Sequence, residues 1–129
     1  MLLAYGGTMK KTVILTIAYF LIQGIVHNIG HPVTPAFVRS LDIPDFMFGV
    51  FFASMSFGLM IGGPIWGILG DRGKKRNYII IGLLLYSIGQ VFFGYVGNQY
   101  IMIIFRFISG IGAVAASTLL ISHLIEISD

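Results

Sequence analysis

The sequence contains no cysteine and very little charge, and both shortages limit what the protein can be. Without cysteine, neither a disulfide framework nor a thiolate metal site enters the interpretation. Charged residues make up 10% of the chain, whereas a soluble domain carries about 25%. No nucleophile paired with a base and no metal-ligand spacing is present, so enzyme activity, metals and cofactors have no support. The net charge of +3 lies in short loops and does not indicate nucleic-acid binding.

Uncharged runs dominate the chain instead, and 57% of its residues are hydrophobic. The runs cover residues 12–38, 46–70, 77–105 and 107–125. A membrane-spanning helix needs roughly 20 apolar residues, so the third run is too long for one span. The segment YVGNQY (95–100) breaks it with glycine and asparagine, which favour turns. We therefore predict an all-α membrane protein in contact with the lipid bilayer, with four transmembrane helices at about 12–31, 46–70, 77–95 and 99–122.

The N-terminal residues differ in character from the rest of the chain. Residues 1–11 are predicted to be a cytoplasmic N-terminus, and Met-Lys-Lys at 9–11 is typical of a bacterial start. Tyr-Gly-Gly-Thr just before it is the product that a translated ribosome-binding site would give, so we interpret residues 1–8 as a start-site overcall. Residues 9–24 also have the basic start and apolar core of a signal peptide, but no small-residue cleavage site comes after them.

Basic residues gather on one side of the predicted spans. Lys10 and Lys11 precede the first span, and four bases lie at 72–76, between the second and third spans. On the other side, 39–45 holds one base and two acids, and 95–100 holds no charge. Lys and Arg accumulate in cytoplasmic loops. This bias of six bases to one places both chain ends in the cytoplasm, in a multi-pass protein of the plasma membrane.

Small residues recur at helical spacing in the second and fourth spans. Those of the second span are Gly58, Gly62, Gly63 and Gly67. The segment GIGAVAAS (110–117), with Gly110 and Gly112, repeats the theme. Such spacing lets helix backbones approach closely in lipid, so we predict tight helix packing. Pro64 removes a backbone donor and is expected to bend the second span.

Three short motifs succeed one another along the chain. They are PVTP (32–35), GILGDRGKKR (67–76) and RFISGIGAV (106–114). In this order they resemble P-v-x-P, G-x-L-a-D-r-x-G-r-r and R-x-x-q-G-x-g-a-a of major facilitator superfamily transporters, specifically the twelve-helix drug/proton antiporter group. The matching residues of the loop motif are Gly67, Leu69, Asp71, Arg72, Lys75 and Arg76. Lys74 holds the family's second glycine position, and Gly73 comes one residue early. Ser109 replaces the glutamine of the third motif, and Val114 its last alanine.

The resemblance covers about residues 10–129 and implies a fold and a function. It implies the first part of the N-terminal six-helix half of a major facilitator fold, in which three-helix repeats surround a midplane site. The expected function is secondary transport of a small organic solute or drug, coupled to protons, by alternating access, as in multidrug efflux antiporters. The C-terminal helices of the same carrier would then be missing partners.

Arg106 is the first candidate for a functional side chain. It lies about 10 Å into the fourth span if that helix begins near Gln99. An arginine inside the membrane costs about 2.5–3.5 kcal/mol on insertion scales, so it is a functional candidate by default. The resemblance implies a role in proton coupling or in the electrostatics of the cavity. The alternative is that the side chain snorkels to the outer interface.

A polar stripe on the first span is the second candidate. Thr16, Tyr19, Gln23, His27 and His31 recur at intervals of three or four residues, which places them on one helix face. The resemblance implies that helices one and four line a central cavity. The cavity-lining candidates are Tyr19, Gln23, His27, Asn28 and Ser117. Hydrogen bonding between helices explains the same stripe equally well.

Asp71 ends the second span at the membrane surface. The resemblance implies that this acid engages the N-terminal dipole of a helix in the other half of the carrier, together with the bases of its own motif, and so favours the outward-facing state. Glu126 and Asp129 are expected to pair with Lys75 or Arg76. A solvated loop would account for the bases but not for the acid before them.

Two other functions fit the length of the chain. One is a truncated membrane remnant without transport activity. The other is a complete four-helix multidrug pump, which depends on an acidic residue inside its first helix. All five acids of this sequence lie at span ends or in loops, which argues against that pump.

Overall fold

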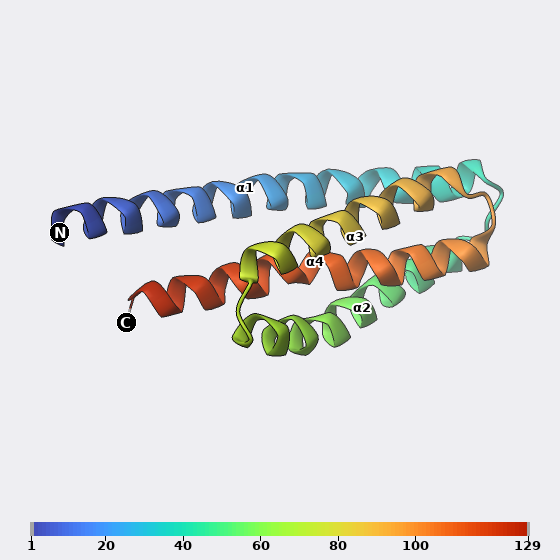
Figure 1. Ribbon diagram of the computed structural model, residues 1–129. Helices are drawn as coiled ribbons and strands as arrows, with labels where there is room; N and C mark the ends of the chain where they lie inside the picture. The colour runs from blue at the N-terminus through green and yellow to red at the C-terminus, as the bar shows by residue number, and fades with distance from the viewer. Residues whose placement is uncertain (1, 129) are drawn as a thin grey trace.

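The computed structural model describes residues 2–128, with the side chains of residues 2–5 and 30–32 excepted. It consists of four long helices joined by short loops (Figure 1). The helices are α1 (Leu2–Ser40), α2 (Phe46–Asp71), α3 (Lys75–Tyr95) and α4 (Gln99–Ser128). All four are long and apolar enough to cross a membrane. The prediction of an all-α protein with four membrane-spanning helices is confirmed.

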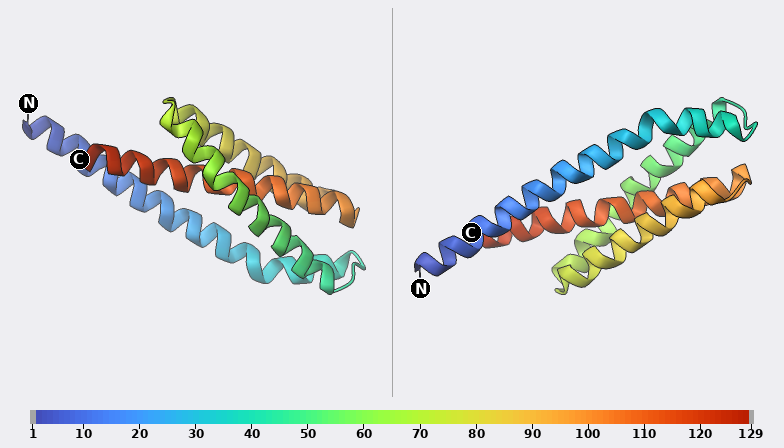
Figure 2. Two further views of the ribbon diagram at one scale, coloured as in Figure 1. Left: turned by 90° about the horizontal axis from the view of Figure 1, so that it is seen from below. Right: turned by 90° about the horizontal axis from the view of Figure 1, so that it is seen from above.

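Successive helices run in opposite directions. The two chain ends and the 72–74 loop lie toward one end of the molecule, and the loops at 41–45 and 96–98 lie at the other (Figures 1 and 2). Six of the eight lysine and arginine residues therefore lie toward the end of the bundle that carries the chain termini. This arrangement agrees with the orientation expected from the distribution of lysine and arginine.

The ends of α2 and α3 lie within two residues of the ends of the predicted spans. Helix α4 continues past residue 122, where its predicted span ends. Helix α1 extends well beyond both ends of its predicted span, 12–31. At 1.5 Å per residue its 39 residues measure about 58 Å, roughly twice the hydrocarbon core of a bilayer. Proline is tolerated within membrane helices because neighbouring groups satisfy the freed carbonyls. The backbone stays helical through Pro32 and Pro35. The C-terminal part of α1 changes direction (Figure 2). Helix α2 likewise continues across Pro64.

Helix α4 lies between α2 and α3 and contacts both through small residues. On the α2 side, a side chain at Gly58 would meet the carbonyl of Phe107, and one at Gly110 would meet the carbonyl of Met55. Two hydrogen bonds join the same pair of helices. Ser54 Oγ donates to the carbonyl of Ile103 (2.9 Å), and Trp66 Nε1 donates to the carbonyl of Ile111 (2.7 Å).

The α3 side of α4 is equally close. A side chain at Gly82 would meet the Cβ of Ala115, and one at Gly112 would meet the backbone of Gly82 and Tyr86. Gly110 and Gly112 thus face different neighbours, one on each side of α4. In contrast, Gly67 has open space where a side chain would lie.

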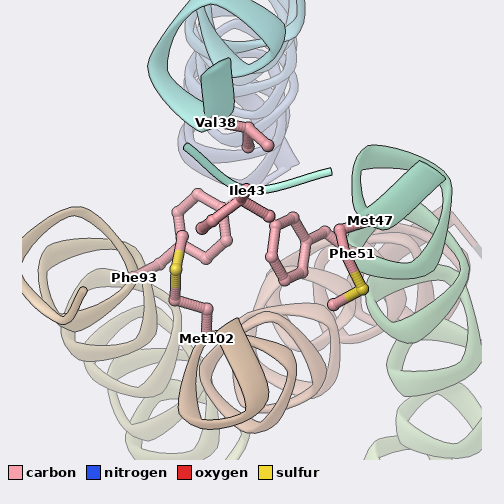
Figure 3. Close-up of a cluster of buried hydrophobic side chains, with 6 residues drawn as sticks. All are labelled: Val38, Ile43, Met47, Phe51, Phe93 and Met102. Carbon is pink, nitrogen blue, oxygen red and sulfur yellow. The ribbon is translucent and has the colours of Figure 1, made fainter. Parts of the chain in front are cut away.

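Helix α1 is attached to this three-helix unit mainly at its C-terminal end. A cluster of buried side chains joins that end and the 41–45 loop to the other helices (Figure 3). Its members are Val38, Ile43, Met47, Phe51, Phe93 and Met102. Elsewhere α1 is hardly packed, since 6% of its spanning segment is buried compared with 39% for α4. The remaining face of α1 is therefore open to lipid or to further helices.

The turn between α2 and α3 explains the departure from the loop motif. Gly73 has φ +91°, and Lys74 has φ +61° in the left-handed region. The amide of Asn77 donates to the carbonyl of Lys74 (2.9 Å), which begins α3. Lys74 therefore takes the backbone conformation that a glycine would take at that position. Two consecutive residues of this turn, Gly73 and Lys74, therefore have positive φ.

Replacing Lys74 by glycine should stabilise the protein. The left-handed conformation costs a non-glycine residue about 1–2 kcal/mol, and the extra chain entropy of glycine offsets part of this. We expect K74G to raise the free energy of unfolding by about 0.5–1 kcal/mol, measured by thermal unfolding in detergent. K74A removes the same charge but keeps a Cβ, so it should bring no gain. Equal stabilisation by both variants would refute the explanation.

Adding one methyl group at Gly82 should loosen the packing of α3 on α4. The new Cβ would overlap the Cβ of Ala115, and overpacking costs about 1–3 kcal/mol. We expect G82A to lower the midpoint of thermal unfolding by several degrees. Gly94, on the same helix, has nothing within 4 Å of the position of a Cβ, so G94A is the matched control. Equal loss of stability in both variants would contradict the packing account.

Candidate functional site

Several cavities lie along the face of α1 that looks toward α2, α3 and α4. The smallest encloses about 50 Å³ beside Arg106, and neighbouring ones of about 180 and 320 Å³ follow α1 past Gln23. A more open hollow of about 500 Å³ reaches Arg106 from between α1 and α3. We call this region the α1 groove. Its polar lining residues are Tyr19, Gln23, His27, Thr34, Tyr86, Ser87, Gln90, Arg106 and Ser117.

The guanidinium of Arg106 lies at the centre of contacts from α1, α2 and α3. Its Nη1 donates to Gln90 Oε1 (3.1 Å), and its Nη2 donates to Thr34 Oγ1 (3.2 Å). The same Nη1 lies 3.8 Å from the sulfur of Met55, and the guanidinium carbon lies 3.8 Å from the centre of the Phe93 ring. The side chain thus points between α1, α2 and α3.

All of these contacts are neutral. Among the residues that the structure describes, the ion pairs are Arg39–Asp45 and Lys75–Glu126, and both lie at helix ends. Within that part of the chain, the charge of Arg106 is held by dipoles and an aromatic face instead of a carboxylate. A cation held in this way attracts an anion or a polarised oxygen that enters the groove.

Gln23 joins α1 to α4. Its Nε2 donates to the carbonyl of Ala113 (3.4 Å), and its Oε1 accepts from Ser117 Oγ (3.3 Å). Both residues also line the cavity of about 320 Å³. Both explanations of the polar stripe, cavity lining and hydrogen bonding between helices, therefore apply to Gln23.

The other members of the stripe occupy different surroundings. Tyr19 lines the cavity of about 180 Å³, and His27 lines that cavity and two more. Asn28 lines none of these cavities. Its side-chain amide donates to the carbonyl of Gly24 (2.7 Å) in the preceding turn of α1, and it is exposed. The side chain of His31 lies outside the described residues. Thr16 is buried.

The loop motif lies at the end of the bundle that carries the chain termini. Leu69 packs against the buried cluster of Trp66, Ala115 and Leu119. Asp71 and Arg72 are exposed. Among residues 2–128, no ion pair or side-chain hydrogen bond engages the carboxylate of Asp71.

Lys75 is the base of the motif that bonds within the bundle. Its Nζ donates to Ser122 Oγ (2.9 Å) and forms a salt bridge with Glu126. The Lys75 side chain is 13% exposed, whereas that of Glu126 is 59% exposed. Arg76 is exposed, and Asp129 lies outside the described residues. Glu126 therefore meets one of the two bases expected for it, and the pair joins the start of α3 to the end of α4.

Sequence analysis did not single out Thr34, Tyr86 or Gln90 as site residues. Thr34 belongs to the PVTP motif, so its bond to Arg106 brings two of the three motifs together. Tyr86 and Gln90 lie four residues apart on α3 and hydrogen-bond each other (3.1 Å). Their spacing on an otherwise apolar span is the signal that could have identified them. No cluster of potential metal ligands occurs among the described residues.

Comparisons with known proteins agree with this arrangement. The sequence profile of the Major Facilitator Superfamily matches residues 12–129. The chain is 31% identical over 99 residues to quinolone resistance protein NorA of Staphylococcus aureus, covering 75% of this chain and 26% of the relative. It is 30% identical over 102 residues to multidrug resistance protein 1 of Bacillus subtilis, covering 79% of this chain and 26% of the relative. No solved structure matches significantly.

The chain thus spans about a quarter of the length of these curated relatives. The profile, by contrast, covers nearly all of it and includes all three motifs. The profile match and the four membrane-spanning helices lead to the same conclusion: the protein belongs to the Major Facilitator Superfamily, a family of membrane transporters and not of enzymes.

Proposed function

We propose that the chain is part of a secondary transporter that moves a small organic solute or drug by alternating access, coupled to protons. The observation that carries the proposal is Arg106, an intramembrane cation held by neutral side chains at the border of a groove. Intramembrane ionisable residues of this kind mark substrate and ion pathways. The relatives named for quinolone and multidrug resistance make a drug the substrate class to test first.

The same proposal assigns the chain to the first part of the N-terminal six-helix half of the carrier. In such folds the substrate site lies between repeats near the bilayer midplane. The open face of α1 and the unoccupied carboxylate of Asp71 are the surfaces that further helices would meet. With the basic end of the bundle in the cytoplasm of a bacterial cell, the carrier lies in the plasma membrane.

Asp71 acts in this proposal as half of a conformational gate. The acid has no partner among the described residues and stands beside exposed bases, so it is available to a helix terminus elsewhere in the carrier. The Lys75–Glu126 pair would hold the adjoining ends of α3 and α4 during the movement. Because these groups are largely exposed, they bias an equilibrium between states and do not hold the fold.

Neutralising Asp71 should reduce transport without preventing membrane insertion. A contact between an exposed carboxylate and a helix N-terminus contributes about 0.3–1 kcal/mol, so we expect D71N to slow drug transport about two- to fivefold. Transport by the full-length carrier in proteoliposomes is the measurement. Asp45→Asn is the matched control, because Asp45 pairs with Arg39 in a surface bridge exposed by 69–76%. Unchanged transport by D71N would contradict the gate.

Replacing Arg106 by lysine should uncouple drug movement from protons. Lysine keeps the charge but cannot donate to Gln90 and Thr34 at once from a planar fork. Hydrogen bonds to a charged group contribute about 1.5–3 kcal/mol, so drug-dependent proton flux by R106K should fall about tenfold or more. Arg39→Lys, at an exposed position, is the control. Proton flux equal to that of the wild-type carrier would refute the role of Arg106.

A further inference from the structure

Two polar side chains of α3 face the α1 groove beside Arg106. Tyr86 and Gln90 lie one helical turn apart, and both line the cavities that Arg106 borders. Tyr86 additionally lines the cavity of about 180 Å³, together with Tyr19, Gln23 and His27. The three side chains form a hydrogen-bonded chain in the order Arg106, Gln90, Tyr86.

The chemistry of arginine sets the direction of every bond in this chain. A guanidinium has only donors, so the group of Gln90 that faces it must be the carbonyl oxygen. The amide nitrogen of Gln90 then faces Tyr86, 3.1 Å from the phenolic oxygen. An amide nitrogen only donates, so the Tyr86 oxygen is the acceptor in this bond.

The phenolic hydrogen of Tyr86 must consequently point away from Gln90. Among residues 2–128, no other hydrogen bond engages the Tyr86 hydroxyl. The residue borders the cavity of about 180 Å³, where apolar walls come from Ile22, Val26 and Leu83. The hydroxyl of Tyr86 is therefore a hydrogen-bond donor within the groove. The charge of Arg106 sets the direction of this donor through Gln90.

We propose that Tyr86 is a substrate-binding residue that donates its hydroxyl hydrogen to an acceptor on the transported molecule, and that Gln90 is the positioning residue that sets this direction. This inference rests on the proposed function of the groove. The ligand class is an apolar ring system that carries a carbonyl or ether oxygen. Its rings occupy the apolar walls, and its oxygen accepts from Tyr86.

Two variants separate the donor from the residue that orients it. Tyr86→Phe removes the hydroxyl. Gln90→Glu keeps an oxygen for Arg106 but offers only acceptors, so the Tyr86 hydrogen must turn toward residue 90 and leave the cavity. Both variants should therefore lose the same ligand contact, although Gln90→Glu leaves Tyr86 in place.

The test uses two neutral probes, so that the added charge at residue 90 does not act on the ligand. Acridone carries a ring ketone, and 9,10-dihydroacridine has a methylene group in its place. Binding is measured by fluorescence with the full-length carrier in nanodiscs. A neutral hydrogen bond changes affinity about two- to tenfold, so Y86F and Q90E should each raise the Kd of acridone by that factor. The Kd of 9,10-dihydroacridine should stay unchanged, and the double variant should equal Y86F.

Tyr95→Phe is the matched control, because Tyr95 also lies on α3, is 86% exposed and lines none of the cavities of the α1 groove. It should bind both probes as the wild type does. If the wild type binds acridone and neither Y86F nor Q90E changes its Kd, the inference is wrong and the proposed function stands. If Q90E still weakens binding in the Y86F background, Gln90 does not act through Tyr86. If the wild type binds neither probe, the proposed substrate class and the inference are both overturned.

Discussion

The close approach of backbones on the two sides of α4 is the constraint on which the rest of this structure depends. Gly58 and Gly110 bring α2 against one side, and Gly82 and Gly112 bring α3 against the other. In lipid, burying apolar side chains provides little drive for helix association, so van der Waals contact and hydrogen bonds between helices must provide it. The small residues allow both. The backbone carbonyl groups of α4 consequently come within reach of Ser54 and Trp66 on α2.

This packing leaves α1 as the separate element. A buried cluster fixes its C-terminal end (Figure 3). On the N-terminal side of this cluster, polar contacts join α1 to α4, from Gln23 to the carbonyl of Ala113 and from Arg106 to Thr34. The groove exists because polar contacts with space between them, rather than interlocking small residues, join α1 to the three-helix unit. A helix fixed at one end and loosely joined along its length suits a transporter, whose site must open and close. The tightly packed and the loosely packed parts of the bundle thus arise from different side-chain chemistry along the same chain.

Much of this fold could be predicted from the sequence, because charge and hydropathy report where the chain meets lipid. Charge and hydropathy did not predict the ends of α1. Lys10, Lys11 and the PVTP segment indicate the expected membrane boundaries, but the helix continues past all of them. Arg106 was recognisable because it is a lone charge in an apolar run. Tyr86 and Gln90 gave only a weaker signal, their four-residue spacing on an apolar span, because their importance comes from the packing of α3 against α4 beside Arg106.

We propose that the α1 groove is a water-accessible path for the substrate. Because the chain has no cysteine, single cysteines can be introduced into it without a background signal from this region. His27 lines the groove, whereas Ile25 lies two residues away and lines none of its cavities. The most direct measurement is the rate at which a water-soluble thiol reagent modifies His27→Cys and Ile25→Cys in the full-length carrier in nanodiscs. The account predicts rapid modification at position 27, slowed by bound acridone, and little at position 25. Equal rates at both positions, with no protection by ligand, would contradict it.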